Sequence, residues 1–82
     1  MKLSEFILLN ENEKTLVVLH NGILIGKRKS EPLIIFLFQL ENYYVETWCH
    51  QQEKKVLEFT AFNSSQNLAP YLDAISIDEL LN

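Results

Sequence analysis

Three side chains in the central part of the chain are of the types that carry acid–base chemistry. They are Glu46, His50 and Glu58, and they flank Trp48 in the segments YYVETWCH and VLEFTAF. Carboxylates and an imidazole transfer protons near neutral pH, and together they can also hold a cation. Either role requires the groups to meet within hydrogen-bond reach, so it depends on the elements that position them.

Two antiparallel strands are predicted at residues 33–40 and 43–50. The first is the apolar run LIIFLFQL, which lies between Pro32 and the pair Glu41-Asn42 and is typical of a buried strand. A two-residue turn at Glu41-Asn42 fixes the register between the strands. Because side chains alternate across a strand, this register gives a core face made of Ile34, Phe36, Phe38, Leu40, Tyr43, Val45, Thr47 and Cys49.

A third strand is predicted at residues 56–62, where the odd positions Leu57, Phe59 and Ala61 are apolar and should point inward. A two-residue turn before this strand would put Leu57 on the wrong face, so a longer loop at 51–55 or a bulge is needed. The repaired register places Thr47 opposite Phe59, Glu58 opposite Trp48 and Thr60 opposite Glu46.

The second face of this sheet holds the acid–base candidates, but in poor geometry for catalysis. Four strand residues separate Glu46 from His50, which is about 13 Å between Cα atoms at about 3.3 Å per residue. A flat sheet face also offers no enclosed pocket. We therefore predict a non-enzymatic protein with no catalytic, cofactor-binding or metal-ligating residues. The alternative is a small-ligand binder or enzyme that uses Glu46, His50 and Glu58.

The same face is better suited to binding a protein partner or a second copy of the chain, because aromatic and apolar side chains gather there. The predicted interaction surface comprises Leu24, Ile35, Leu37, Tyr44, Glu46, Trp48, His50 and Glu58. The competing interpretation is that an N-terminal helix covers this face and makes it a second core layer.

The N-terminal third allows two interpretations. Asn10 followed by Glu13 is a capping-box pattern, which predicts a helix over 11–20 with Gly22 as the left-handed residue past its end. Asn21-Gly22 is also a strong hairpin signal, and the pair Val17-Val18 favours a strand. A short helical turn over residues 5–9 precedes this segment.

A first strand is predicted at residues 23–28, joined to the next by a four-residue turn that sets Ile25 opposite Phe36. The basic cluster Lys27-Arg28-Lys29 ends this strand and is interpreted as protection of a sheet edge. Beyond the last strand, a short helix is predicted over 68–74 and a final helical turn over 77–81.

Composition narrows the classes of function. The chain has 82 residues, 48% hydrophobic content and a net charge of −4, which favours a folded domain and disfavours contact with nucleic-acid phosphates. The single cysteine forms no internal disulfide, and Cys49 and His50 point to opposite faces of a strand, so no metal site is expected. The short apolar run at 6–9 predicts neither an export signal nor a membrane span, and we expect a cytoplasmic protein.

The segments LSEF, FLFQL, YYVETW, FTAFNSS and LAPYLDAISIDEL, taken together, resemble a family of short uncharacterised proteins from Bacteroidetes bacteria. In that family the segment corresponding to residues 11–21 lacks the valine pair, so the resemblance implies a helix there. It implies no chemistry. The overall prediction is a single α+β domain over residues 1–82, with a four-stranded antiparallel meander sheet and with N-terminal helices and a short C-terminal helix on one face.

Overall fold

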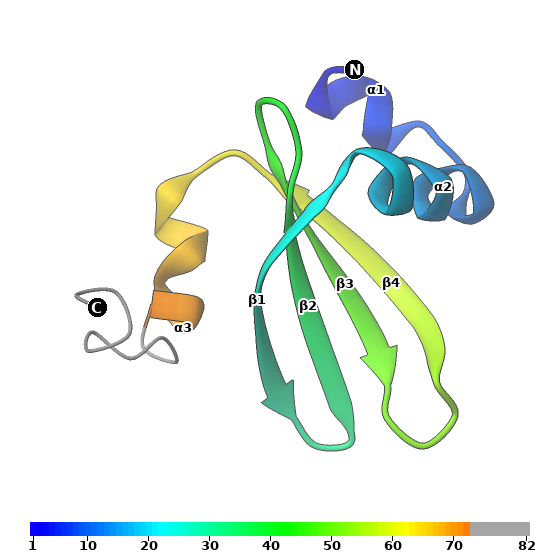
Figure 1. The fold of residues 1–82 in the computed structure, drawn as a ribbon, viewed down its shortest axis with the longest axis vertical. Helices are drawn as coiled ribbons and strands as arrows, with labels where there is room; N and C mark the ends of the chain where they lie inside the picture. The colour runs from blue at the N-terminus through cyan, green and yellow to red at the C-terminus, as the bar shows by residue number, and fades with distance from the viewer. Residues whose placement is uncertain (73–82) are drawn as a thin grey trace.

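The computed structural model describes residues 1–72 of the chain. Its elements are α1 (Leu3–Ile7), α2 (Glu11–Asn21), β1 (Ile23–Ser30), β2 (Leu33–Gln39), β3 (Tyr44–His50), β4 (Lys55–Phe62), the 3-10 turn η1 (Ser65–Leu68) and α3 (Ala69–Leu72) (Figure 1). The strands form one antiparallel sheet in the order β1-β2-β3-β4. The predicted α+β class and meander are confirmed, while the helical turn predicted at 77–81 lies outside the described residues.

The helix α2 settles the choice left open by the sequence. Asn10 Oδ1 accepts a hydrogen bond from the Glu13 amide at 2.8 Å, and Glu13 Oε1 accepts one from the Asn10 amide at 3.1 Å. This is the predicted capping box, and it satisfies two amides that a helix start would otherwise leave without partners. The prediction for Gly22 is wrong, because its φ of −86° is that of an extended residue. A Cβ there would lie 2.6 Å from the Val18 carbonyl oxygen, so close approach requires the glycine.

The pairings of β2 with β3 and of β3 with β4 follow the predicted register. Phe36 pairs with Thr47, which in turn pairs with Phe59. A bulge between Trp48 and Cys49 provides the predicted repair. Leu57 is the extra residue of that bulge, so it is exposed instead of pointing inward as predicted.

The predicted register of β1 is wrong. The strand continues to Ser30, which shortens the turn to Glu31-Pro32, a pair joined by a cis peptide bond. Gly26 therefore pairs with Leu37, after an irregularity that takes up Ile25. The change places Arg28 beside Ile35 on the second face, and it moves Leu24 beside Phe38 on the first face.

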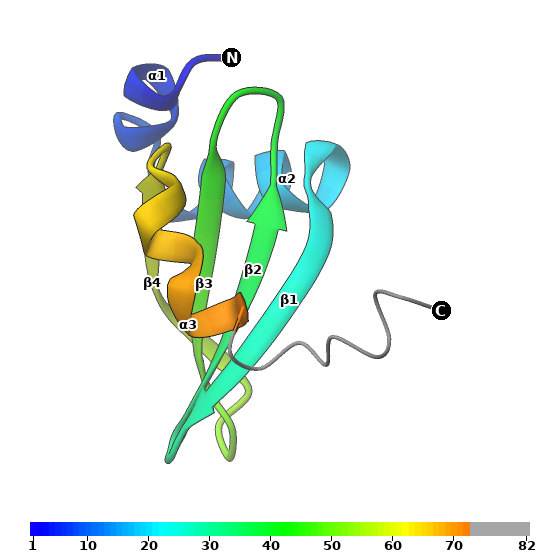
Figure 2. The same cartoon turned by 90° about the vertical axis from the view of Figure 1, so that its left-hand side faces the viewer.

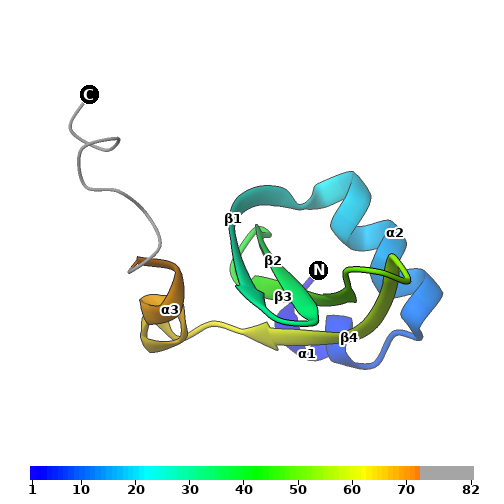
Figure 3. The same cartoon turned by 90° about the horizontal axis from the view of Figure 1, so that it is seen from below.

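Two layers of helix cover opposite faces of the sheet. The first face carries the core cluster Phe6, Val18, Leu40, Tyr43 and Val45, to which α1 and α2 contribute. The second face carries the cluster Ile35, Leu37, Phe62 and Tyr71, to which α3 contributes. Figures 2 and 3 show α2 on one side of the strands and α3 on the other. The C-terminal helix therefore does not share a face with the N-terminal helices.

Candidate functional site

The C-terminal segment covers the centre of the surface predicted for partner binding. Ile35, Leu37 and Glu46 are buried, and Tyr44 and Trp48 are half-buried beside Leu68 and Tyr71. The predicted alternative of a second core layer thus describes this face, with η1 and α3 as the cover in place of an N-terminal helix.

Of the three outlying residues of that surface, Leu24 lies on the other face, while Glu58 and His50 lie at the margin of the second face. Leu24 pairs with Phe38 and so belongs to the first face. Glu58 is exposed opposite Trp48. His50 lies at the end of β3, where its Nδ1 accepts a hydrogen bond from the Glu53 amide at 3.3 Å. The structure therefore places Leu24 on the first face, Glu58 on the second face beside Trp48, and His50 at the end of β3.

The centre of the second face is a polar cluster around Glu46. Glu46 Oε2 accepts a hydrogen bond from the Tyr71 hydroxyl at 2.6 Å and one from Arg28 Nη2 at 3.2 Å. The Arg28 guanidinium carbon lies 5.2 Å from the centroid of the Trp48 ring and 5.5 Å from that of Tyr71. A buried carboxylate needs such partners, because an unpaired charge there would be strongly destabilising.

The electrostatics of this cluster keep Tyr71 and Arg28 protonated as hydrogen-bond donors to Glu46. Burial, together with the hydrogen bond to Glu46, raises the pKa of Tyr71, so its hydroxyl remains a neutral donor. Burial opposes the charged form of Arg28, but hydrogen bonding to Tyr71 and Glu46 outweighs this and raises its pKa. Both partners of Glu46 hold their protons, so they leave the carboxylate engaged as an acceptor instead of free for proton transfer.

Sequence reasoning missed Arg28 and Tyr71 as members of this cluster. The sequence pattern indicates edge protection by Arg28 together with its lysine neighbours, although of these three residues only Lys27 and Lys29 are exposed. The available signal is Glu46 itself, which lies between Tyr44 and Trp48 on one face of a central strand. A carboxylate in such a position requires a cation or a hydrogen-bond donor from another element.

The described part of the chain shows neither a candidate metal centre nor a candidate membrane span. Residues 1–72 contain no group of three His, Cys, Asp or Glu side chains that could hold a metal ion. No helix within the same residues is long and apolar enough to cross a membrane.

Comparison of the chain with protein-family models, with curated proteins and with solved structures found no match.

The first face presents the more open surface. Helix α2 crosses the strands near the β2–β3 turn and lies over only that end of the sheet (Figures 1 and 2). At the other end, paired positions carry half-buried side chains, and we name this surface the open end of the first face. It is formed by Ile34, Phe36, Cys49 and Val56.

A groove of about 90 Å³ joins this open end to α2. It is lined by Thr15, Val18, Leu19, Phe38, Thr47, Val56 and Phe59. Leu19 is exposed and forms the helix side of the groove, while Val56 belongs to the sheet side. The groove therefore offers an apolar strip bounded by a helix on one side and by strands below.

Proposed function

We propose that the chain is a non-enzymatic protein-interaction module that binds one amphipathic helix of a partner protein. The binding surface is the open end of the first face together with the adjoining groove. This differs from the surface expected on the second face, because η1 and α3 already cover the latter within the chain itself.

The observation that carries the proposal is the partial cover provided by α2. Strand β2 has seven residues, so it is about 23 Å long at about 3.3 Å per residue. A helix lying across the strands occupies about 10 to 12 Å of that length. The uncovered remainder is about the width of a second helix, which would pack beside α2 and bury the apolar side chains there.

The chemistry of the surface specifies the partner helix. Its floor is apolar, so the helix needs apolar residues at intervals of three and four positions. Lys27 pairs with Phe36 and Lys29 pairs with Ile34, so the exposed lysines border this floor along β1. Acidic residues along one edge of the partner helix would complement them and fix its direction.

The test uses a synthetic amphipathic peptide of about 18 residues, built from Leu and Ala with Glu along one edge, and a matched peptide with Lys in place of Glu. We expect the acidic peptide to shift the backbone amide resonances of Phe36, Cys49 and Val56, and to bind about tenfold more tightly than the basic peptide. Val56→Thr, which keeps the side-chain shape, should weaken binding.

Lys27→Glu should lower the affinity for the acidic peptide, whereas Lys2→Glu makes the same charge change at the residue before α1 and should have little effect. Amide shifts confined to the second face, at Ile35, Leu37 and Trp48, would contradict the proposed surface. A dimer of the chain alone that Val56→Thr dissociates, measured by light scattering, would identify the occupant as a second copy and overturn the proposal of a partner helix.

A further inference from the structure

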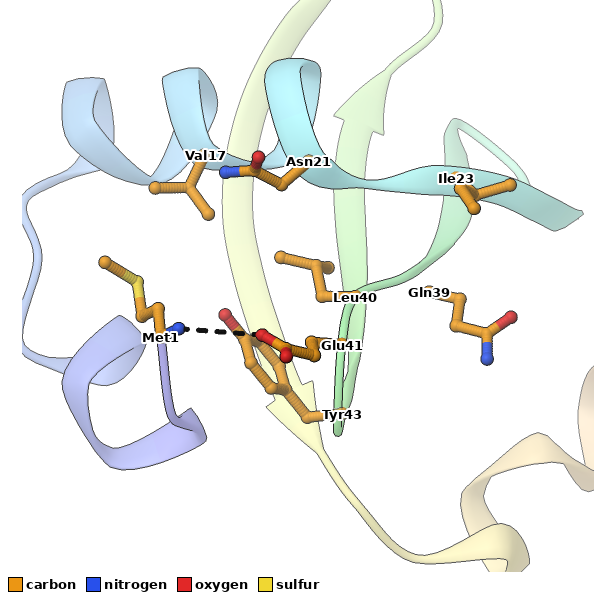
Figure 4. Close-up of a pocket in the computed structure, with 8 residues that line it drawn as sticks. All are labelled: Met1, Val17, Asn21, Ile23, Gln39, Leu40, Glu41 and Tyr43. Atoms are coloured by element: carbon orange, nitrogen blue, oxygen red, sulfur yellow. Dashed lines mark ion pairs between the residues drawn. The ribbon is translucent and has the colours of Figure 1, made fainter.

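We propose that a second pocket, on the other side of α2, binds a small primary amine with an apolar body. The pocket has a volume of about 490 Å³, within the usual range for small-molecule sites. It lies between the N-terminal helices, the start of β1 and the β2–β3 turn, and Figure 4 shows its lining side chains.

The helical period explains why α2 serves two separate sites. Thr15 and Leu19 are four residues apart and line the groove of the open end. Val17 and Asn21 are also four residues apart, and they line the pocket instead. Val18, between these two rows, is buried against the sheet. A ligand in the pocket would therefore leave the proposed helix-binding surface free.

Tyr43 provides the first reason to expect a ligand. Its side chain is buried, with 2% of the residue exposed, yet its hydroxyl has no hydrogen-bond partner within the described part of the chain. Such a group loses its bonds to water without replacing them, so it calls for a partner. In Figure 4 the phenol extends from the strand side of the pocket toward the space below Val17.

The charges around Tyr43 indicate that the ligand is a cation. Burial, together with the negative charges of Glu5 and Glu41, raises the pKa of this phenol, so the hydroxyl stays neutral. Glu41 lines the pocket, and within residues 1–72 the lining includes no Lys or Arg side chain. The Met1 amino nitrogen lies 3.9 Å from Glu41 Oε2, so this carboxylate already pairs with one ammonium group, which a bound amine would replace.

The remaining walls define the rest of the ligand. Val17 and Leu40 present apolar surface, and the side-chain amides of Asn21 and Gln39 lie at the edge of the pocket (Figure 4). A bound amine would donate a hydrogen bond to the Glu41 carboxylate and, once the side chains that bury Tyr43 Oη move aside, a second one to that hydroxyl, while its apolar portion would pack against Val17 and Leu40. The ligand class that fits is an alkyl or arylalkyl monoamine.

The experiment is a titration of the full chain, labelled with ¹⁵N, with phenethylamine, 2-phenylethanol and 3-phenylpropionate. We expect phenethylamine to produce saturable shifts at the amides of Asn21, Gln39, Glu41 and Tyr43. The alcohol, which lacks the charge, should bind about tenfold more weakly, and the carboxylate should produce no saturable shift. Equal affinity for the amine and the alcohol, or no saturable shift with the amine, would overturn the proposal.

Two conservative variants separate binding from folding. Tyr43→Phe keeps the ring and removes only the hydroxyl, and Glu41→Gln keeps the shape and removes the charge. Each should weaken phenethylamine binding about fivefold or more, whereas Tyr44→Phe, on the opposite face of the sheet, should bind as the wild type does. Wild-type affinity in both Tyr43→Phe and Glu41→Gln would show that the amine binds elsewhere.

Discussion

Tyr71 donates a hydrogen bond of 2.6 Å to Glu46, and this bond fastens the C-terminal helix to the centre of the sheet. Helix α3 has four residues, too few to be stable without tertiary contacts. Its Tyr71 is 2% exposed, so the residue that makes the bond is also buried in the core cluster of the second face. The C-terminal cover of the second face therefore depends on Tyr71, with Leu68 packed beside it.

Removing the Tyr71 hydroxyl tests this dependence. Tyr71→Phe leaves the ring in place but deprives the buried Glu46 carboxylate of a donor, so we expect the free energy of unfolding to fall by about 1 to 3 kcal/mol. Tyr44→Phe is the matched control, because Tyr44 contacts Phe62 through its ring, with 5.6 Å between the centroids. The control should change stability by less than about 0.5 kcal/mol. Urea unfolding measures both, and equal stability of the two variants would contradict the role assigned to the bond.

Gly26 leaves the space that Tyr71 occupies. A Cβ at Gly26 would lie 3.3 Å from Tyr71 Cδ1, and the methyl groups of a valine would come closer still. We expect Gly26→Val to destabilise the protein in the wild-type background, although valine by itself favours a strand. In the Tyr71→Ala background the clash is absent, so the same substitution should be neutral or stabilising. A double-mutant cycle should give a coupling of about 1 kcal/mol or more, and additive effects would contradict the contact.

The strand registers show which parts of the fold are encoded locally. A two-residue turn and the alternation of side chains were enough to align β2 with β3. The requirement that Phe59 point to the core face was enough to align β4 with β3. The capping box of α2 is equally local, since Asn10 and Glu13 contact each other directly. Rules that act over a few residues therefore predicted these two strand registers, whereas for α2 the same rules left a hairpin at Asn21-Gly22 equally open.

The second face could not be predicted in the same way. Its cover depends on the fit of Tyr71 against Gly26, two residues far apart in the sequence and joined only by the folded sheet. The register of β1 also depended on the length of the turn at Glu31-Pro32, which alternation alone does not fix. The predicted four-residue turn displaces Arg28 along β1. Glu46 is therefore taken for a free carboxylate, although it forms an ion pair with Arg28.

Alkaline pH should lower the free energy of unfolding, because the buried tyrosine phenols lose their protons there. Burial raises the pKa of both Tyr71 and Tyr43 above the ordinary value of 10.0. Nearby acidic side chains raise it further. Because the folded state holds these protons more tightly than the unfolded state does, the contribution is fully present below pH 10 and is lost as the pH rises above it. Urea midpoints measured from about pH 8 to 11 should fall at the alkaline end.

The Tyr71→Phe variant is the control for this pH dependence. It lacks one of the two raised phenols, so its midpoint should fall less steeply than that of the wild type at the alkaline end. The burial of Cys49 also raises its thiol pKa from 9.0, so a Cys49→Ala variant is needed to separate the thiol from the phenols. A wild-type midpoint that stays constant or rises above pH 10 would contradict the assignment.

Trp48 distinguishes a structural second face from an interaction surface. Its ring lies over the Arg28 guanidinium at 5.2 Å and packs against the core cluster of that face. Trp48→Ala should therefore lower the free energy of unfolding by about 2 to 4 kcal/mol and uncover Arg28, without a specific effect on association. Trp48→Phe keeps an aromatic face for the cation and removes an indole Nε1 that is buried without a hydrogen-bond partner among residues 1–72, so its cost should be about 1 kcal/mol. Urea unfolding combined with light scattering checks both variants. If Trp48→Ala were as stable as the wild type and differed only in its solution mass, this face would be the interface after all.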